Sequence, residues 1–522
     1  MTSSTPSPEL SESYDVVILG GALSGAATAT LLKKRDPDLR ILIIERAETL
    51  TRRVGEATVE VSAFFMSRVL GMTRFLNETQ IAKQGLRFWF NNEKVSNLAE
   101  ASEIGPRYNV RIPSYQLDRS TFDEEVLRRA VEKGVTVIRP ATVRHVELVD
   151  GGQQTIDFKY QETNHRVQAR WVVDASGVAS LLARKNGWLV RNHEHPTASA
   201  WSRWRNVKDW DGAELAEKFP CWAKAVAGIR GTATNHLIGD GWWAWMIPLK
   251  GGDTSIGVVF DQRIVDWPEG GSVGDRLKDF LMEHPVGAEM LENAEYEAED
   301  VHWRRNLAYY STTSAGDGFV LVGDAAAFMD PFYSPGMDWI SFSTSCAANL
   351  IMRQRNGERM GPIVAQYNHD FATCYRRWFT SLYKDKYHYM GEFDLLHLAF
   401  RLDLGLYYCG VVQPPFLIGA DALLEPPFTP PSGRFFSALM SLYNRRFAAI
   451  AKRRRRLGLL GRMNDRKRAL IPGYTLSRSE ILRMIPLLKE WVMLELREGW
   501  RTWGHAEDET EQITPAPARS SP

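Results

Sequence analysis

The sequence predicts an α/β fold, and three observations support that prediction. The apolar run at residues 14–19 leads directly into a glycine-rich turn and a helical segment at 26–34, as in a strand buried on both faces that is followed by a crossover helix. Alternating apolar and polar residues, as at 254–260, predict an antiparallel sheet inserted in the middle of the chain. From Ala347 onward, apolar residues recur at helical spacing and predict a C-terminal helical cap.

The composition narrows the class of protein. The 522 residues carry 64 Lys and Arg against 63 Asp and Glu, and the net charge of +1 argues against a nucleic-acid-binding surface. Four cysteines without C-x-x-C spacing favour reduced thiols, and we predict no metal site. No signal-peptide pattern is visible, and Arg401 and Asp403 interrupt the most apolar stretch, 395–412. These features predict a cytoplasmic protein without an integral membrane segment.

A nucleotide-binding unit is predicted at the N-terminus. The strand at 14–19 runs into Gly20-Gly21-Ala22-Leu23-Ser24-Gly25, and a second strand, 40–44, ends in Glu45, whose carboxylate can accept hydrogen bonds from ribose hydroxyls. This pattern indicates a Rossmann-like βαβ unit, although Ala22 replaces the second glycine of G-x-G-x-x-G. The predicted nucleotide-binding residues of the unit are Gly20, Ala22, Leu23, Ser24, Gly25, Glu45 and Arg46.

Two later strand ends extend this pattern. Residues 171–177 (WVVDASG) end in Asp-Ala-Ser-Gly, and residues 319–324 (FVLVGD) end in Gly-Asp, after which we expect a helix to start at the small residues 325–327. In this order the motifs resemble the FAD-binding domain of the flavoprotein monooxygenases related to para-hydroxybenzoate hydroxylase. The resemblance implies that FAD is the cofactor, that Asp324 binds a ribityl hydroxyl, and that Arg119, within Leu117-Asp118-Arg119-Ser120, reaches the cofactor. Because no second glycine-rich unit for NAD(P)H follows, we expect the electrons to arrive either by a transient encounter or, as reduced FAD, from a separate flavin reductase.

Residues 243–248 (WAWMIP) fit W-x-W-x-I-P, the signature that separates flavin-dependent halogenases from other flavin monooxygenases. The chain therefore resembles the tryptophan halogenase-like family. The resemblance implies that Trp243 and Trp245 shield the flavin, so that an organic substrate is not hydroxylated there. A structural interpretation is also open, because Trp243, Trp245 and Ile247 share one face of a strand and such a stripe is often core. The two interpretations are compatible.

A second halogenase feature is a lysine between flavin and substrate. Residues 55–58 (GEAT) resemble the family's loop beside the flavin and make Ala57 a cofactor-binding residue, and residues 82–88 (AKQGLRF) resemble the stretch that carries its lysine. The resemblance implies a catalytic role for Lys83. In the implied mechanism, halide attacks the flavin C4a-hydroperoxide, and a desolvated lysine directs the hypohalous acid that forms. The alternative is a solvated lysine at a strand edge.

The loop expected to hold halide departs from the family pattern. Residues 330–337 (DPFYSPGM) resemble the family's D-P-x-x-S-[TS]-G-[IV] loop, which implies that Ser334 and Gly336 hold halide and that Gly336 and Met337 contact the cofactor. The Thr/Ser position is Pro335, which has no N–H. One missing donor weakens a desolvated anion site by about 1–3 kcal/mol.

Two further residues at this loop bear on the reaction. Tyr333 stands where tryptophan-acting members carry a glutamate, so free tryptophan is not the expected substrate. Asp338 follows the loop, and a carboxylate there would oppose halide binding. The leading hypothesis is therefore an FADH2- and O2-dependent halogenase of a phenol, indole or pyrrole. The alternatives are a hydroxylating or desaturating flavoenzyme with a defective halide site, and a non-catalytic flavin-binding partner in a biosynthetic assembly.

The expected organisation has one discontinuous nucleotide-binding domain. The predicted parts are a disordered lead (1–13), the FAD domain (14–184 and 310–350), a substrate-covering sheet (185–309), a helical region (351–505) and a disordered tail (506–522). Nine of the 17 tryptophans lie between 190 and 303, either as the wall of an aromatic substrate pocket or as a core. Eleven basic residues within 445–468 fit a solvated helix face, docking of an acidic acyl carrier protein, or an anionic membrane surface.

Overall fold

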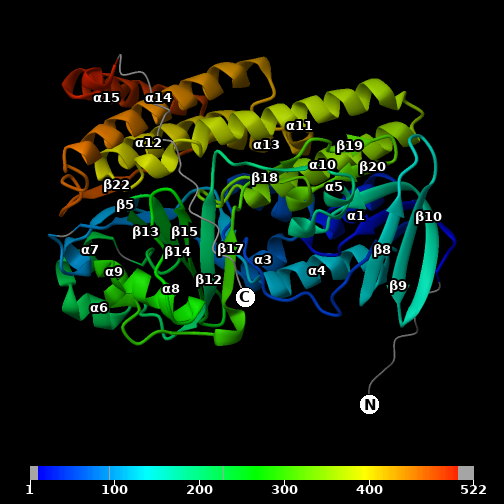
Figure 1. Ribbon diagram of the computed structural model, residues 1–522, viewed down its shortest axis with the longest axis horizontal. Coiled ribbons are helices and arrows are strands. Elements are labelled where there is room, and N and C mark those ends of the chain that lie inside the picture. The colour runs from blue at the N-terminus through cyan, green and yellow to red at the C-terminus, as the bar shows by residue number, and fades with distance from the viewer. Residues whose placement is uncertain (1–9, 93, 227, 504–522) are drawn as a thin grey trace, which may run out of the picture.

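The structure is a computed structural model that describes residues 10–92, 94–226 and 228–503. Figure 1 shows two β-sheets side by side beneath a layer of long C-terminal helices. Residues 1–9 of the predicted lead and the whole predicted tail lie outside the described residues. The remainder of the lead is described, and the first strand, β1, begins at Ser13.

The first sheet forms the nucleotide-binding half of the molecule. In the described chain it has eight strands in the order β19-β20-β10-β1-β2-β7, with β9 and β8 continuing antiparallel from β10. The pairs β20–β10, β10–β1, β1–β2 and β2–β7 are all parallel. Val16, Val17 and Ile18 are fully buried, as expected for a central strand of a parallel sheet. The strands are β1 Ser13–Leu19, β2 Ile41–Ile44, β7 Thr136–Ile138, β8 Ala141–Glu147, β9 Gln154–Tyr160, β10 Thr163–Asp174, β19 Ala315–Gly316 and β20 Phe319–Leu321.

The second sheet is mostly antiparallel and combines strands from three parts of the sequence. Its order is β16-β12-β15-β14-β13-β4-β5-β22, and β17 also pairs with β12. Strands β4, β5 and β22 come from outside the segment 185–309, so that segment supplies only part of the sheet. The strands are β4 Leu86–Phe90, β5 Ser102–Pro106, β12 Thr197–Arg205, β13 Thr234–Gly239, β14 Trp242–Pro248, β15 Thr254–Asp261, β16 Glu295–Tyr296, β17 His302–Arg305 and β22 Arg468–Ile471.

Two smaller sheets connect these halves. Strand β3 (Ile81–Lys83) pairs with β6 (Ser114–Gln116), and β18 (Tyr309–Ser311) pairs with β11 (Leu189–Arg191) and β21 (Ala327–Phe328). The expectation of a helix at 325–327 was wrong. Gly323 has a φ of 56°, and the chain forms a 3-10 turn and then strand β21 there. The helix begins only at Gly336, because Pro331 and Pro335 precede it and Pro335 caps it.

The helices of the first half cover the sheets, and those after residue 335 form the upper layer (Figure 1). Helix α1 packs against α4 and α10, and α11 packs against α14. The helices are α1 Leu23–Arg35, α2 Glu60–Phe64, α3 Thr73–Thr79, α4 Arg119–Glu132, α5 Leu181–Lys185, α6 Ala213–Lys218, α7 Pro220–Ala225, α8 Val273–Met282, α9 Pro285–Met290, α10 Gly336–Arg355, α11 Met360–Leu382, α12 Phe393–Tyr407, α13 Gln413–Ile418, α14 Pro431–Arg456 and α15 Met484–Arg497.

Helix α12 continues through a π-helical segment, Tyr408–Val412, into α13. By length and composition, the run Phe393–Ile418 could cross a membrane, and 67% of its most apolar window is buried inside the protein, as in the core helix of a folded domain. Asp403 within it accepts a hydrogen bond from the buried ammonium of Lys386 at 2.7 Å. A buried ion pair of this kind fits the interior of a protein.

The tryptophans of the middle segment mostly form a core. Trp204, Trp210, Trp222 and Trp242 are buried in one hydrophobic cluster with Trp89, and Trp267 and Trp303 pack against its edge. Trp89 stacks on Trp210 with ring centroids 5.3 Å apart. The interpretation of these residues as a core is confirmed, and none of them lines the cavity described below.

Candidate functional site

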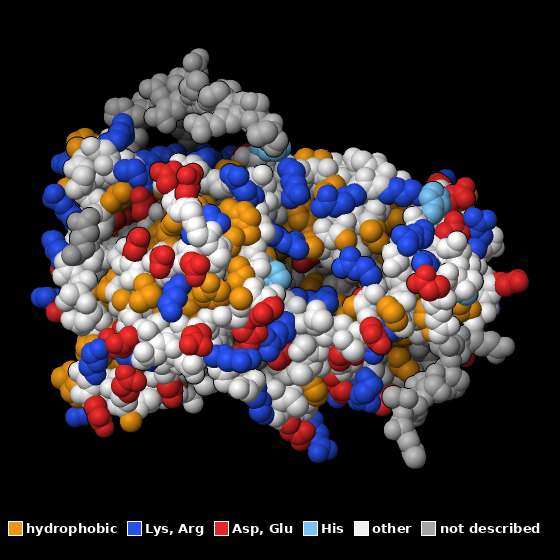
Figure 2. Space-filling model, turned by 60° about the horizontal axis from the view of Figure 1, so that its bottom comes forward, with side chains coloured by type: hydrophobic (Ala, Val, Ile, Leu, Met, Phe, Trp, Pro, Cys, Tyr) orange, Lys and Arg blue, Asp and Glu red, His pale blue; other side chains and the backbone are white. Residues whose placement is uncertain are grey.

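The predicted nucleotide motifs meet at one edge of the parallel sheet. Gly20 follows β1, Glu45 follows β2, Asp174 ends β10 and Asp324 follows β20, and these four strands are parallel neighbours. The carboxyl ends of parallel strands are the usual place for a nucleotide in such a sheet. Figure 2 shows a hollow near the middle of one face, with Lys and Arg side chains along its rim.

The glycines of these motifs allow the close packing that the site requires. A Cβ on Gly25 would lie 1.9 Å from the Gly20 carbonyl oxygen, and one on Gly20 would lie 2.6 Å from the carbonyl of Ala175. A Cβ on Gly323 would lie 2.6 Å from Ser24 Oγ. Segments that are far apart in sequence are therefore in van der Waals contact around the start of α1, which fits a cradle for a dinucleotide.

Glu45 and Asp324, two of the acidic residues at this edge, differ in their hydrogen bonds. Both carboxylate oxygens of Glu45 accept backbone hydrogen bonds, from Gly21 N at 2.6 Å and Ala47 N at 2.8 Å, so Glu45 fastens the glycine-rich turn. Burial raises the pKa of Asp324 to about 6, and the charge of Arg119 opposes that rise. None of the described residues donates a hydrogen bond to the Asp324 carboxylate, which leaves it available to a ligand hydroxyl. These residues fit FAD.

The remaining predicted cofactor residues surround the same edge. Arg119 is buried and is held by Asp123 at 2.9 and 3.0 Å and by the carbonyls of Val54 and Gly55. Ala57 is buried and pairs with Gln116. The other positions are Ala22 at the N-cap of α1, Leu23 buried and Ser24 half-buried in its first turn, Arg46 exposed after β2, and Met337 buried in the first turn of α10.

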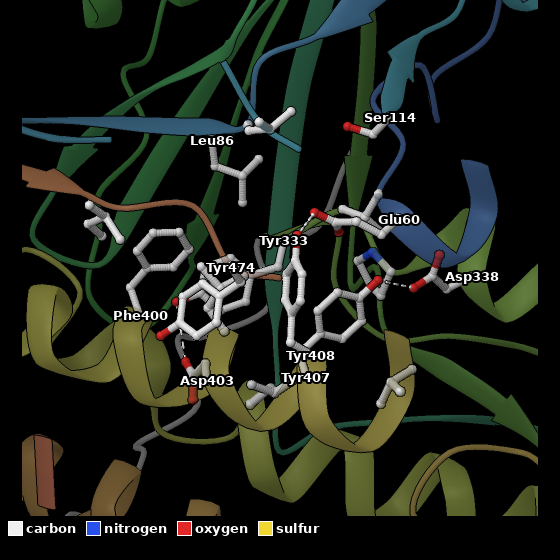
Figure 3. Close-up of a pocket in the computed structure, with 18 of the residues that line it drawn as sticks. Glu60, Leu86, Ser114, Tyr333, Asp338, Phe400, Asp403, Tyr407, Tyr408 and Tyr474 are labelled. Atoms are coloured by element: carbon white, nitrogen blue, oxygen red, sulfur yellow. Dashed lines mark hydrogen bonds between the residues drawn. The ribbon is translucent and has the colours of Figure 1, made fainter. Parts of the chain in front are cut away.

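A cavity of about 1160 Å³, counting the part open to solvent, lies between the second sheet and α12. Figure 3 shows Phe400, Asp403 and Tyr407 of α12, with Tyr408 of the following π-helical segment, on one wall and Leu86, Ser114 and Glu60 opposite. Apolar and aromatic side chains dominate the lining, which is typical of a site for a small organic ligand. The lining residues central to the argument are Glu60, Lys83, Leu86, Arg111, Tyr333, Pro335, Asp338, Phe400, Tyr407, Tyr408, Phe428, Ile471 and Tyr474.

Lys83 lies on the wall of this cavity. It ends β3 and is buried, and its Nζ donates to the Thr58 carbonyl at 2.8 Å. Burial lowers the pKa of Lys83 to about 8, although the nearby carboxylates of Glu60 and Asp338 act in the opposite direction. The alternative of a solvated edge lysine is therefore wrong, because β6 and the loop at Thr58 enclose the side chain.

Two carboxyl groups face Lys83 across the cavity. Asp338 accepts from Ser62 N at 2.8 Å and from the Tyr407 hydroxyl at 2.7 Å, and burial raises its pKa to about 7. Glu60 accepts from the Tyr408 hydroxyl at 2.6 Å, and burial raises its pKa above the ordinary value. The site thus holds one amine and two carboxyl groups whose pKa values are shifted toward neutral pH, as expected of groups that exchange protons.

The loop predicted to hold halide has an unusual backbone. Tyr333 and Ser334 have φ values of 68° and 59°, in the left-handed region that non-glycine residues seldom occupy. The Ser334 amide donates to the Pro331 carbonyl at 2.9 Å, so this N–H is already used within the turn. Gly336 is the first residue of α10, where helix amides point outward. Among the predicted halide residues, Gly336 is thus the one placed to offer an amide.

Trp243 and Trp245 lie behind this loop and outside the cavity lining. Trp243 Nε1 donates to the Tyr387 hydroxyl at 2.8 Å, and that hydroxyl donates to Asp330 at 2.8 Å. The indole packs on Phe332 with ring centroids 5.1 Å apart. Trp245 donates to Ser255 Oγ at 3.2 Å. Trp243 therefore supports the 330–335 loop, and Trp245 packs against Trp243 with ring centroids 5.9 Å apart.

Most residues of the far wall of the cavity were not predicted from the sequence. Asp403 accepts from Tyr333 at 3.3 Å and also from Tyr443, and Lys386 completes this buried group. Tyr407 and Tyr408 come from the same α12 segment, which has no motif of its own. Glu60 could have been found, because it lies two residues after the loop at 55–58.

One cluster of carboxylates has the spacing of a metal site. Glu214, Glu289 and Glu292 have oxygen atoms within 4.8 Å of one another. The Lys208 ammonium lies 2.7, 2.9 and 2.6 Å from these three carboxylates, so a cation of the protein already occupies the centre.

Comparisons with known proteins agree with this geometry. The chain matches the tryptophan halogenase family model over residues 15–101 and 93–389. It is 29% identical over 372 residues to the flavin-dependent halogenase chlA of Dictyostelium discoideum, which covers 65% of this chain and 60% of that protein. It is 24% identical over 388 residues to a 1H-pyrrole-2-carbonyl-[peptidyl-carrier protein] chlorinase of Pseudomonas fluorescens, covering 70% of this chain and 82% of the relative.

A solved structure shows the same fold. The crystal structure of halogenase PltM in complex with phloroglucinol and FAD superimposes with a TM-score of 0.68 at 19% identity, over 92% of this chain and 96% of that one. The agreement extends to the C-terminal layer, beyond the residues that the family model matches. With FAD motifs at the sheet edge and a family match over most of its length, the chain belongs to the tryptophan halogenase family of flavin-dependent enzymes.

Proposed function

We propose that the protein halogenates a small electron-rich aromatic molecule, most favourably a phenol, in the cavity beside α12. The observation that carries the proposal is the buried Lys83 on the wall of that cavity, next to the 330–335 loop. Bound reduced FAD would react with O2 and halide and supply hypohalous acid. One ring C–H bond is then replaced by a carbon–halogen bond, and the hydroxyl of the hypohalous acid and the ring proton leave as water.

Lys83 would direct the halogenating agent. Because burial lowers its pKa to about 8, the amine exchanges its proton near neutral pH and can donate to or capture the agent. Its hydrogen bond to the Thr58 carbonyl fixes the direction in which Nζ points. Lys83 is thus held between the 55–58 loop and the cavity.

Glu60 would take the proton that the ring releases. Its carboxylate faces the cavity and is held by Tyr408, and a raised pKa strengthens it as a base. Tyr333 stands where tryptophan-acting members of the family carry a glutamate. Glu60 of α2 comes from a different part of the sequence and still supplies an acid–base group to the cavity.

The lining supports a neutral aromatic substrate. Lys83 and Arg111 are the cations among the lining residues, and Arg111 is exposed at the rim, so little is available to bind a carboxylate in the interior. Phenolic rings fit walls made of Tyr333, Phe400 and Tyr407. The phloroglucinol named with PltM is a phenol and supports this choice.

A carrier-bound pyrrole, as named for the Pseudomonas fluorescens relative, is the other substrate form considered. The basic segment 445–468 gives this form limited support, because several of its charges are paired with carboxylates of the same chain. Arg455 pairs with Asp240, Arg466 with Glu100 and Arg468 with Glu103. We therefore propose a free substrate, in a cytoplasmic protein that receives reduced FAD from a separate reductase.

Oxygenation without halide is the second candidate function. The observation that favours it is the 330–335 loop, in which Pro335 has no N–H and the Ser334 amide is already bonded. Turnover of a phenol that does not depend on halide, with a hydroxylated product, would support this second function.

The experiment is an assay with the protein, FAD, a flavin reductase, NADH, bromide and a panel of phenols. We expect brominated products detected by mass spectrometry. Lys83→Met should lower bromination by at least about 100-fold while FAD still binds. Lys250→Met, at an exposed lysine, serves as the matched control and should leave the rate unchanged. Products without bromine across the panel would overturn the proposal.

A further inference from the structure

The outer surface of the C-terminal helix α15 is apolar. Its inner face buries Met484, Leu487 and Leu494, as an amphipathic helix should. Several outward side chains of α15 and of the 3-10 turns that flank it are also apolar and are 53–65% exposed: Leu482, Ile485, Val492, Met493, Leu496 and Trp500. Trp503 continues the row at 65% exposed. Large apolar side chains that gather on one exposed face usually mark a binding surface.

These exposed side chains form one stripe. At 100° per residue, positions 485, 492, 493 and 496 fall within an arc of about 100° on α15. Leu482, Trp500 and Trp503 lie in or next to the 3-10 turns at the two ends of the helix. From 485 to 496 the stripe is about 17 Å long. Figure 1 places α15 at the outer edge of the helical layer, beside α14.

Positive charge surrounds the stripe. Residues 431–503 contain 17 Lys and Arg and only 5 Asp and Glu, in a chain whose total net charge is +1. Lys489 lies within the stripe, and Arg483, Arg497 and Arg501 flank it, all exposed. Some basic residues of α14 are neutralised, since Arg446 and Arg454 bind Glu495 and Glu498, but these same bonds fix α15 against α14.

We propose that this face of α15 docks the protein on an anionic lipid surface. Tryptophan and aliphatic side chains on one face, with Lys and Arg beside them, are the features of a helix that lies in a membrane interface. A second copy of the chain fits poorly, because a symmetric pair would bring two strongly basic regions together. An acidic protein would match the charge, but a row of exposed aliphatic and tryptophan side chains is the pattern of a helix that inserts its apolar face into lipid.

The location of the stripe connects it to the cavity. Tyr474 lines the cavity, the Arg483 guanidinium lies 5.8 Å from its ring centroid, and Tyr474 and Met484 both lie next to Gly405 of α12. The cavity reaches the surface at Pro472 and Gly473, which are exposed lining residues just before this segment. A docked molecule would therefore hold the cavity mouth close to the lipid, where an apolar aromatic substrate concentrates.

The test is flotation of the full FAD-loaded chain with vesicles of phosphatidylcholine, with or without about a quarter phosphatidylglycerol. We expect binding to the anionic vesicles, weak binding to phosphatidylcholine alone, and release as NaCl rises from about 0.1 M to about 0.5 M. The double variant Val492→Glu, Leu496→Glu should lower binding at least about 10-fold. The double variant Val131→Glu, Val149→Glu places the same two charges on exposed residues far along the sequence from α15 and should bind as the parent does.

Three results would overturn the proposal. These are absence of binding to either vesicle, a lipid-free dimer that the double variant dissociates, and binding to an acidic protein with no affinity for lipid. Unchanged FAD absorbance and melting temperature confirm that the variants fold. Bromination of a soluble phenol should be the same in the double variant and the parent, so failure of docking and failure of the proposed reaction are distinguishable.

Discussion

At the scale of single residues, the site depends on ionisable groups whose pKa values are shifted by burial. Burial lowers the pKa of Lys83 and raises the pKa values of Glu60 and Asp338. Lys83 could be predicted from sequence, because local motifs on either side of it fix its place. Asp403 and Tyr408 could not, because they lie more than 300 residues away and reach the cavity only through the packing of α12. A long-range contact of this kind leaves no signal in local periodicity.

Glu60 gives a prediction at this scale. Burial raises its pKa, so the carboxyl is protonated at low pH and the rate should rise with pH as it ionises. Glu60→Gln should lower kcat by about 100-fold and remove this acid limb from the pH–rate profile. In Tyr408→Phe the carboxylate loses its donor, so the limb should move to higher pH. An acid limb that persists unchanged in Glu60→Gln would show that another group is the base.

Asp338 predicts how halide affinity depends on pH. Its pKa of about 7 means that the carboxyl is mostly neutral below pH 7 and negative above it. The KM for bromide should therefore rise as pH increases through 7, by at least about threefold, because a carboxylate near the start of α10 repels the anion. Asp338→Asn should give a KM that changes little over this range. If the variant keeps the parent's pH dependence, Asp338 does not face the halide.

At the scale of secondary-structure elements, the sequence predicted strands and helices well where one pattern covers a whole element. The turn after β20 is the exception, because the small residues 325–327 suit a helix start but are held in a turn and strand by β18. The β22 strand was also missed. Its four residues lie among helices and form a strand only because β5 offers an edge.

Arg454 of α14 links this helix to the start of α12 and to the end of α15. Its guanidinium is buried and binds Glu392 at 2.7 Å, Asp394 at 2.8 Å and Glu498 at 2.6 Å. Arg454→Met leaves three acidic groups without their partner, and we expect a loss of about 3–5 kcal/mol in the free energy of unfolding. Arg456→Met, two residues along and exposed, should change it by less than about 0.5 kcal/mol. Denaturant unfolding monitored by circular dichroism measures both.

At the scale of the whole molecule, FAD should stabilise the fold, because its predicted cradle joins four strands and α1. At about 100 times its Kd, FAD should raise the free energy of unfolding by about 2.7 kcal/mol. Gly25→Ala should abolish most of this increase, since its Cβ would lie 1.9 Å from the Gly20 oxygen. Gly361→Ala in α11, where a Cβ has open space, is the control and should keep it. An equal FAD effect in Gly25→Ala would contradict the placement of the cofactor.

The overall architecture could be predicted from sequence more fully than its boundaries. The strand–glycine–helix unit and the later strand ends were enough to assign the α/β class and a discontinuous nucleotide domain. They could not show that β4 and β5, which lie within 14–184, belong to the second sheet. Which sheet a strand joins depends on partners elsewhere in the chain. A buried apolar strand such as the one with Phe88 and Phe90 has a sequence that would suit either sheet.

The pairing of β22 with β5 bears on how the protein can be shortened. A fragment that ends near residue 389, where the family match ends, would lack β22 and leave the N–H and C=O groups of β5 unpaired along an open edge. It would also lack α12, which carries one wall of the cavity, and so expose the apolar side chains of the opposite wall, such as Leu86 and Val110, to water. An open strand edge beside an uncovered apolar surface is a template for aggregation. The C-terminal region is thus a solubility element of the fold as well as part of its site.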